Sequence, residues 1–250
     1  MTLSYLFAWM MVLLRSIGLI MQLPVLAGHP VPVTVRLAIS IGLATLLAGL
    51  VPFAPAPGTL WSLIAAASFE IVLGLALGFV VRTAFASVEM GARIMSSEIG
   101  LTATPGLGAP EPTQEPVAAL LASLAVVLFF MFGAHHGVLI AFARSFQLAP
   151  AGAAQFAASA GGSLILDTGR MIELGVRIAA PFIAMNFLVN LAFSVLGKAV
   201  PRMNVFAVSF AARALFGMGL LSTAGALIAR YLFIEFGDLP LRMLDLVKKG

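Results

Sequence analysis

The sequence predicts an all-α, polytopic integral membrane protein of about six apolar helical segments arranged as hairpins. Of its 250 residues, 61% are hydrophobic and only 10% are charged, whereas a soluble domain carries about 25% charged residues. The mean hydropathy is +1.09, and a soluble fold this apolar could not cover its surface with polar groups. The apolar runs are continuous and lack the alternation of barrel strands, which favours helices.

Six candidate spans follow from segment length, because a hydrocarbon core of about 30 Å requires about 20 helical residues. They are residues 3–23, 33–53, 60–81, 117–142, 171–196 and 205–233. The first has an arginine in mid-span, no positive region before it and no small-residue cleavage site, so we expect a retained span rather than a signal peptide. We interpret residues 1–250 as a single membrane domain, with N-terminal hairpins in 1–97 and C-terminal hairpins in 117–250.

The connections between the first spans are short and rich in proline. Residues 29–32 and 52–58 are too short for domains, so the spans they join should form tight antiparallel hairpins. Residues 83–100 carry Glu89, Arg93 and Glu98 among apolar neighbours. This segment is typical of a helix that continues beyond ordinary membrane depth or lies against a partner.

Basic residues do not set an orientation in the membrane. With the six spans above, each side of the bilayer receives five of these residues: Arg36, Arg82, Arg93, Lys198 and Arg202 on one side, and Arg144, Arg170, Arg242, Lys248 and Lys249 on the other. A chain whose hairpins are held by partner subunits rather than by lipid could show this balance.

Several functional classes lack their sequence signals. The chain has no cysteine, which excludes disulfides, thiolate metal sites and cysteine nucleophiles. Serine-hydrolase, zinc-protease and phosphate-loop motifs are absent, so neither an enzyme nor a cofactor is expected. The net charge of +4 is scattered, which gives no basic surface for nucleic acid.

Two charged residues lie inside predicted spans, where an unpaired charge costs several kcal/mol. Arg15 lies midway along the first span and Glu70 within the third. They could form a proton or ion relay, but a structural contact with a neighbouring helix is the favoured interpretation. Glu70, Gly74 and Gly78 share one helix face, where small residues permit close helix approach, and this spacing suits an assembly interface better than a catalytic site.

Adjacent histidines, His135 and His136, suggest a metal site at first sight. Helix neighbours point about 100° apart, so we expect that the two cannot converge on one ion. Proton transfer remains an alternative, and buried or interfacial histidines are favoured. Later in the chain, Pro201 punctuates a basic turn in which Asn204 can cap the following helix, and a partner-docking point is the alternative to a simple turn.

Residues 98–116 interrupt the apolar chain with four prolines, three glycines and three glutamates. Proline and glycine prevent a regular helix while restricting or permitting particular backbone states. The segment is therefore either a linker between two membrane halves or a shaped element.

Motifs along the whole chain, in order, resemble the FliR family of flagellar export-gate membrane proteins and their type III secretion counterpart, SctT. The resemblance rests on Leu14-Arg15-Ser16-x-Gly18-Leu19 with Pro24-Val25, Glu70-x-x-x-Gly74-x-x-x-Gly78, Gly91 with Gly100-Leu101, His135/His136 with Ser145-Phe146 and Pro150-x-Gly152, Ile178-Ala179-Ala180-Pro181, and Pro201-Arg202-Met203-Asn204-Val205-Phe206. Thr104-Pro105 and Ala212-Arg213 depart from the family pattern, and the first departure concerns the detailed shape of segment 98–116.

The resemblance implies one copy of this chain in a helical gate with FliP-like and FliQ-like subunits, in the bacterial inner membrane. Such chains look like a FliP–FliQ fusion, and FlhB-like and FlhA-like components would lie nearby. The implied cargo is unfolded secreted protein. By the same resemblance, segment 98–116 plugs the closed pore, with Glu98 and Gly100 as hinge candidates and with plug residues Leu101, Thr102, Pro105, Gly106, Gly108, Pro110, Glu111 and Pro112.

Three functional hypotheses follow. The first is a non-enzymatic pore subunit of a type III export gate, with the flagellar system favoured. The second is a proton-coupled small-solute carrier that uses Arg15, Glu70 and His135. A membrane enzyme is disfavoured because no nucleophile or metal set is clustered.

Overall fold

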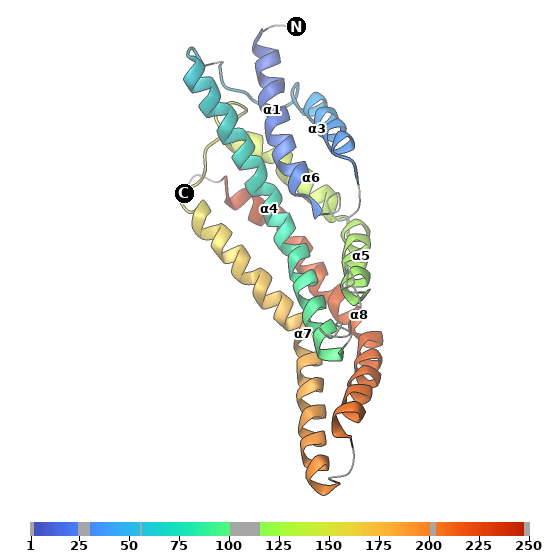
Figure 1. Cartoon of the computed structure of the whole chain (residues 1–250). Coiled ribbons are helices and arrows are strands. Elements are labelled where there is room, and N and C mark those ends of the chain that lie inside the picture. Colours follow the sequence, from blue (N-terminus) through green and yellow to red (C-terminus); the bar gives the residue numbers. More distant parts are fainter. Residues whose placement is uncertain (1–2, 25–30, 56, 101–115, 201–203, 248–250) are drawn as a thin grey trace. The chain divides into compact units, whose positions relative to one another are not determined.

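The computed structural model describes residues 3–24, 31–55, 57–100, 116–200 and 204–247. Throughout these ranges the ordered elements are helices, which confirms the all-α prediction (Figure 1). In chain order they are α1 (Leu3–Gln22), α3 (Val33–Leu47), α4 (Leu60–Ile99), α5 (Pro116–Met131), α6 (Ala134–Leu148), α7 (Ala160–Ala199) and α8 (Val205–Asp245).

The chain divides into two compact units, and four helices, α4, α5, α7 and α8, contribute residues to both. The first unit comprises Met1–Ala84, Phe129–Gly169 and Glu235–Gly250, and the second comprises Phe85–Leu128 and Arg170–Ile234. Within the described ranges, four helices are long and apolar enough to cross a membrane, or five if the bent pair α5–α6 forms one span. The protein is therefore a polytopic membrane protein.

Three helices are longer than the predicted membrane spans. Helices α4 and α7 each have 40 residues and α8 has 41. At 1.5 Å per residue each is about 60 Å long, about twice the thickness of a hydrocarbon core. Residues 83–99 indeed continue the third predicted segment as one helix, and the two C-terminal segments are extended in the same way.

The predicted span 117–142 is wrong as a single helix. The chain forms α5 and α6, with a bend of 67° between them. Gly133 lies at the break with φ +68°, a left-handed conformation that favours glycine and ends the regular helix. The predicted span 33–53 is also shorter than expected, because α3 ends at Leu47, ahead of Gly49 and Pro52.

Glycines allow α1 and α4 to pack backbone against backbone within the first unit. A Cβ added at Gly74 would lie 2.2 Å from the backbone oxygen of Arg15, and one at Gly18 would lie 2.6 Å from that of Ile71. A Cβ at Gly78 would lie 2.8 Å from the backbone oxygen of Leu19. Each of these distances is shorter than the contacts that real Cβ atoms make, so a side chain at any of these positions would push the two helices apart. The close helix approach inferred from the glycine spacing is thus realised between α1 and α4.

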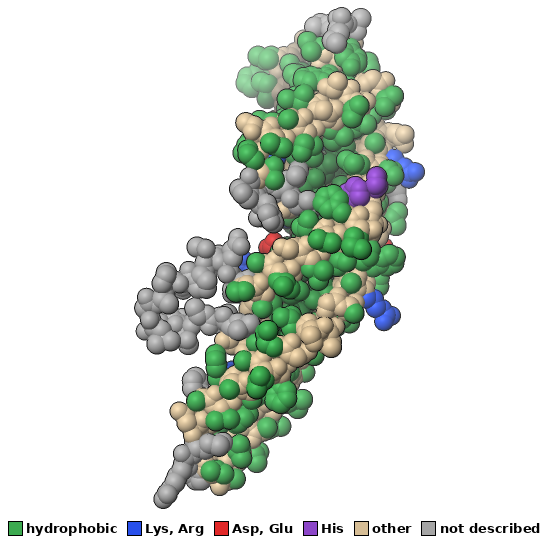
Figure 2. Space-filling view, turned by 90° about the vertical axis from the view of Figure 1, so that its right-hand side faces the viewer, with side chains coloured by type: hydrophobic (Ala, Val, Ile, Leu, Met, Phe, Trp, Pro, Cys, Tyr) green, Lys and Arg blue, Asp and Glu red, His purple; other side chains and the backbone are tan. Residues whose placement is uncertain are grey.

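Large apolar side chains cover much of the surface as well as the core. Figure 2 shows hydrophobic side chains spread over the visible face, with few charged ones between them. Of the most apolar stretch of α7 only 22% is buried, and of that of α8 only 17%. Leu215 and Phe216 on α8 are exposed by 75% and 62%. Surfaces of this kind require lipid or another protein to cover them.

Candidate functional site

The two charges predicted inside spans form a buried ion pair in the first unit. Nε of Arg15 on α1 lies 2.6 Å from Oε2 of Glu70 on α4, and Nη2 donates to Oε1 at 3.0 Å. Both side chains are 0% exposed. This two-bond geometry is the strong form of an arginine–carboxylate contact.

Helix α6 and the residue after it complete the surroundings of Arg15. Nη1 donates to Oγ of Ser145 at 3.1 Å, and Nη2 also donates to the backbone oxygen of Ala149 at 3.0 Å. The Ser145 hydroxyl in turn donates a hydrogen bond to the backbone oxygen of Phe142. The guanidinium carbon lies 4.0 Å from the ring centroid of Phe146, a cation–π distance.

Glu70 also reaches the loop that follows α6. Its Oε1 accepts a hydrogen bond from the backbone N–H of Gly152 at 2.8 Å. Gly152 has φ +86°, and an added Cβ would lie 2.8 Å from the ring of Phe7, so this position requires glycine on two counts.

The connection between α3 and α4 holds that loop in place. Phe53 and Ala151 form an isolated parallel bridge, in which Ala54 N–H donates to the oxygen of Ala151 and Ala151 N–H donates to that of Pro52. Residues 52–54 of the Pro-rich link therefore also position the backbone groups around the ion pair.

We call this arrangement the clasp, defined as Arg15, Glu70, Ser145, Ala149 and Gly152. All three guanidinium nitrogens donate and both carboxylate oxygens accept within it. A pair in which every nitrogen and both oxygens have a partner, without exposure to solvent, suits a structural junction. A relay, in contrast, needs an open donor or acceptor to pass a proton on.

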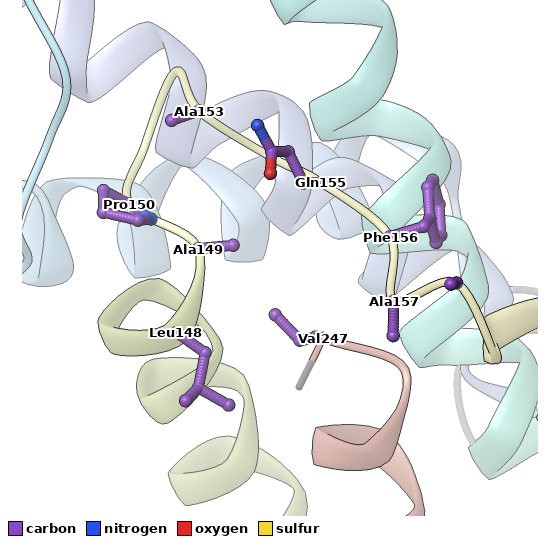
Figure 3. Close-up of a pocket in the computed structure, with 9 residues that line it drawn as sticks. Leu148, Ala149, Pro150, Ala153, Gln155, Phe156, Ala157 and Val247 are labelled. Carbon is purple, nitrogen blue, oxygen red and sulfur yellow. The ribbon is translucent and has the colours of Figure 1, made fainter. Parts of the chain in front are cut away.

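A cavity of about 430 Å³ lies beside the loop in the same unit. Figure 3 shows the chain from Leu148 to Ala157 running along it, with Val247 approaching from the end of α8. The backbone N–H of Ala157 donates to the oxygen of Leu246, which ties the loop to α8. Of the clasp only Ala149 lines this cavity, so it gives the ion pair no solvent channel.

The two histidine rings lie closer together than the 100° between helix neighbours suggests. The rings of His135 and His136 do not diverge, because their centroids lie 4.0 Å apart, and Figure 2 shows the two side chains (purple) together at the surface. Rotation about the side-chain bonds brings the rings together although the Cα–Cβ bonds point apart. His135 also lies 5.1 Å from the ring of Phe130. The described part of the chain contains no group of three or more histidine, cysteine, aspartate or glutamate side chains that could hold a metal ion.

A second buried charge cluster is one that the sequence reasoning missed. Arg242 on α8 is 7% exposed and donates to Oδ1 of Asp167 on α7 at 3.3 Å. Nη2 of Arg242 also bonds the carboxylate and the backbone oxygen of Glu235. The available signal was an aspartate in the apolar first turns of α7 and an arginine two helical turns after a glutamate in α8.

The remaining predicted residues lie at the ends of helices or outside the description. Glu98 accepts a hydrogen bond from Asn186 on α7, and Gly100 ends α4 with φ +83° against the ring of Phe210. Asn204 caps α8, since its Oδ1 accepts from the N–H of Ala207 at 3.2 Å. Outside the described residues lie Leu101, Thr102, Pro105, Gly106, Gly108, Pro110, Glu111, Pro112 and Pro201.

These features define a polytopic α-helical membrane protein with an internal ion-pair clasp and helices longer than a bilayer is thick. The family model described as bacterial export proteins, family 1, matches residues 6–238. The chain belongs to this family.

Curated relatives cover nearly the full length. The flagellar biosynthetic protein FliR of Escherichia coli (strain K12) is 27% identical, over 99% of this chain and 95% of its own. FliR of Caulobacter vibrioides is also 27% identical, over 85% of this chain and 86% of its own. FliR of Bacillus subtilis (strain 168) is 23% identical, over 80% and 79%. The resemblance drawn from the motifs is therefore confirmed.

Removing one partner of the clasp should destabilise the protein strongly. In Glu70→Ala, Arg15 stays buried without a counter-charge and the Gly152 N–H loses its acceptor. We expect a loss of about 3–5 kcal/mol in the free energy of unfolding, measured by detergent-induced unfolding in mixed micelles.

Glu173→Ala is the matched control, because it breaks another carboxylate–arginine pair, with Arg177, whose side chains are 59% and 61% exposed. Its expected effect is below about 0.5 kcal/mol. Equal losses in the two variants would show that the clasp does not stabilise the first unit.

Proposed function

We propose that this chain is a non-enzymatic subunit of the flagellar export gate, the protein-conducting channel of a type III secretion system in the bacterial inner membrane. Membership of the bacterial export family supports the transport role. The names of the curated relatives favour the flagellar system. The cargo would be unfolded secreted protein.

The observation that supports the subunit role most directly is that the apolar surface of two helices extends further than a bilayer is thick. Helices α7 and α8 are about 60 Å long, and a bilayer covers about 30 Å of each. Yet large apolar side chains remain exposed from Ile165 and Leu166 near the start of α7 to Val195 and Leu196 near its end. Half of such a helix needs protein rather than lipid to cover it, which supports assembly with FliP-like and FliQ-like subunits, next to FlhB-like and FlhA-like components.

A proton-coupled carrier receives less support. It requires Arg15, Glu70 and His135 to exchange protons, but the Arg15 and Glu70 side chains have no solvent exposure and are hydrogen-bonded to each other. The ring contacts of His135 are with Phe129, Phe130 and His136, and none is with Arg15 or Glu70.

Isolation of the tagged chain from its own membranes in mild detergent distinguishes these functions. We expect at least two further small polytopic proteins to co-purify with it, and deletion of its gene to abolish secretion of flagellar proteins. The purified chain alone in liposomes should move no solute. Proton-coupled uptake by the single chain, without co-purifying subunits, would establish the carrier instead.

The plug is the finer part of the proposal. Segment 98–116 would obstruct the resting pore and move aside during export, with Glu98 and Gly100 as hinges. The left-handed backbone at Gly100 supports a sharp turn at the end of α4.

Deletion of residues 106–112 tests the plug. The shortened segment should no longer fill the pore, so small-ion leakage across membranes that contain the assembled gate should rise. A matched substitution, Glu89→Gln on the exposed surface of α4, should leave the membrane tight. Unchanged leakage in an assembled gate carrying the deletion would refute the plug.

A further inference from the structure

A row of polar side chains lies along the C-terminal half of α7. Asn186, Asn190, Ser194 and Lys198 recur at every fourth residue, which places them along one ridge of the helix. Asn190, Ser194 and Lys198 are exposed and Asn186 is half-buried. Their neighbours on the helix, such as Phe187 and Leu191, are exposed apolar residues. We refer to these four residues as the polar row.

At the start of the row, two asparagines and a carboxylate form consecutive hydrogen bonds, and the carboxylate determines which group donates in each bond. Nδ2 of Asn186 donates to Glu98 on α4, and Nδ2 of Asn190 donates to Oδ1 of Asn186 at 3.0 Å. An ionised carboxylate only accepts hydrogen bonds, so Asn186 must present its amino group to Glu98. Its oxygen is then left to accept from Asn190.

Because Asn190 donates to Asn186, polar groups without hydrogen-bond partners remain on the exposed surface of α7. Asn190 donates an amino hydrogen to Asn186, and its own Oδ1 has no donor among the described residues. Ser194 and Lys198 also form no hydrogen bond or ion pair within the described part of the chain. In an apolar environment each such group requires a partner.

The opposite face of α7 has a different character. There α7 and α8 form a groove of about 900 Å³ lined almost entirely by apolar side chains, including Pro181, Leu188, Leu215 and Phe216. At about 100° per residue, these α7 positions lie nearly opposite the polar row. Lipid or an apolar helix suits the groove, whereas acyl chains cannot satisfy the row.

We propose that the polar row docks a helix of another membrane subunit, one that presents an amide or hydroxyl donor to Asn190. The inference rests on the proposed role as a gate subunit and specifies the chemistry of one partner contact. Protein is favoured over lipid because α7 exceeds the bilayer in length, and over water because Phe187 and Leu191, which flank the row, are apolar and exposed. Two turns further along, the same partner needs an acceptor for Lys198.

Photo-cross-linking in the intact exporter tests this contact. p-Benzoylphenylalanine is placed at position 194 in place of Ser194, and at position 163 in place of Ser163 as the matched control. Ser163 is a half-buried serine in the first turns of α7, in the first unit and outside the polar row. Position 194 should cross-link to one polytopic subunit, at a helix that carries an asparagine, glutamine, serine or threonine.

Second substitutions test the hydrogen bond itself. Asn190→Leu should lower the cross-linking yield at position 194 by about tenfold, the change expected for loss of one hydrogen bond between helices. Asn190→Gln keeps the acceptor and should restore the yield. Neither should change cross-linking at position 163, and resistance of the variants to trypsin confirms that they fold.

The chain lacks cysteine, so Ser194→Cys gives a single reporter of water access. It should react slowly with a membrane-impermeant maleimide in the intact exporter and rapidly after denaturation. Rapid reaction in the intact exporter, cross-links to lipid alone, or a yield unaffected by Asn190→Leu would each overturn the docking inference. If the exporter still secretes normally in those cases, the proposed function stands while the inference fails.

Discussion

The ion pair between Arg15 and Glu70 is the interaction on which the first unit depends. Two charges without exposure to solvent are tolerable only where each finds a counter-charge and further hydrogen bonds. The pair therefore requires α1 and α4 at contact distance, α6 close enough to offer Ser145, and a loop that turns back to present an oxygen and an N–H group. The glycines of α1 and α4 supply the first condition, since Gly74 lies directly against the backbone of Arg15. The third, the returning loop, is met by Gly152 and by the bridge between Phe53 and Ala151.

A second constraint acts on the C-terminal helices, and it is one of length. An apolar helix that matches the bilayer needs no partner, but α7 and α8 are about twice as long as the hydrocarbon core is thick. Their surfaces remain apolar over that length, apart from the polar row of α7 and a few charged positions. Unlike the clasp, whose charges are paired within the chain, the C-terminal half of α7 leaves both apolar area and polar groups for other molecules to cover. The clasp thus stabilises the chain internally, whereas the exposed surfaces of α7 and α8 are available for assembly.

The sequence identified the clasp residues more readily than their geometry. Arg15 and Glu70 stood out because charges are costly inside spans, and Gly74 because its spacing from Glu70 marks one helix face. No local signal indicated that the partner groups would be the backbone of Ala149 and Gly152, since that contact depends on how the loop after α6 folds back. The break at Gly133 was missed because the apolar pattern runs through it, and only the left-handed backbone distinguishes this glycine from a helical one. Asp167 and Arg242 are 75 residues apart, and their pairing follows from tertiary packing alone.

We propose that the clasp is a structural junction and carries no protons. The most direct measurement is the secretion rate of a chain with Arg15→Gln and Glu70→Gln together, compared in membranes with equal amounts of assembled gate. Two amides keep a hydrogen bond between α1 and α4 and an acceptor for Gly152, but they cannot exchange protons at neutral pH. Secretion by the double variant should stay within a few-fold of that by the unmodified chain. Complete loss of secretion in a fully assembled gate would contradict the proposal and assign the pair a role in proton transfer.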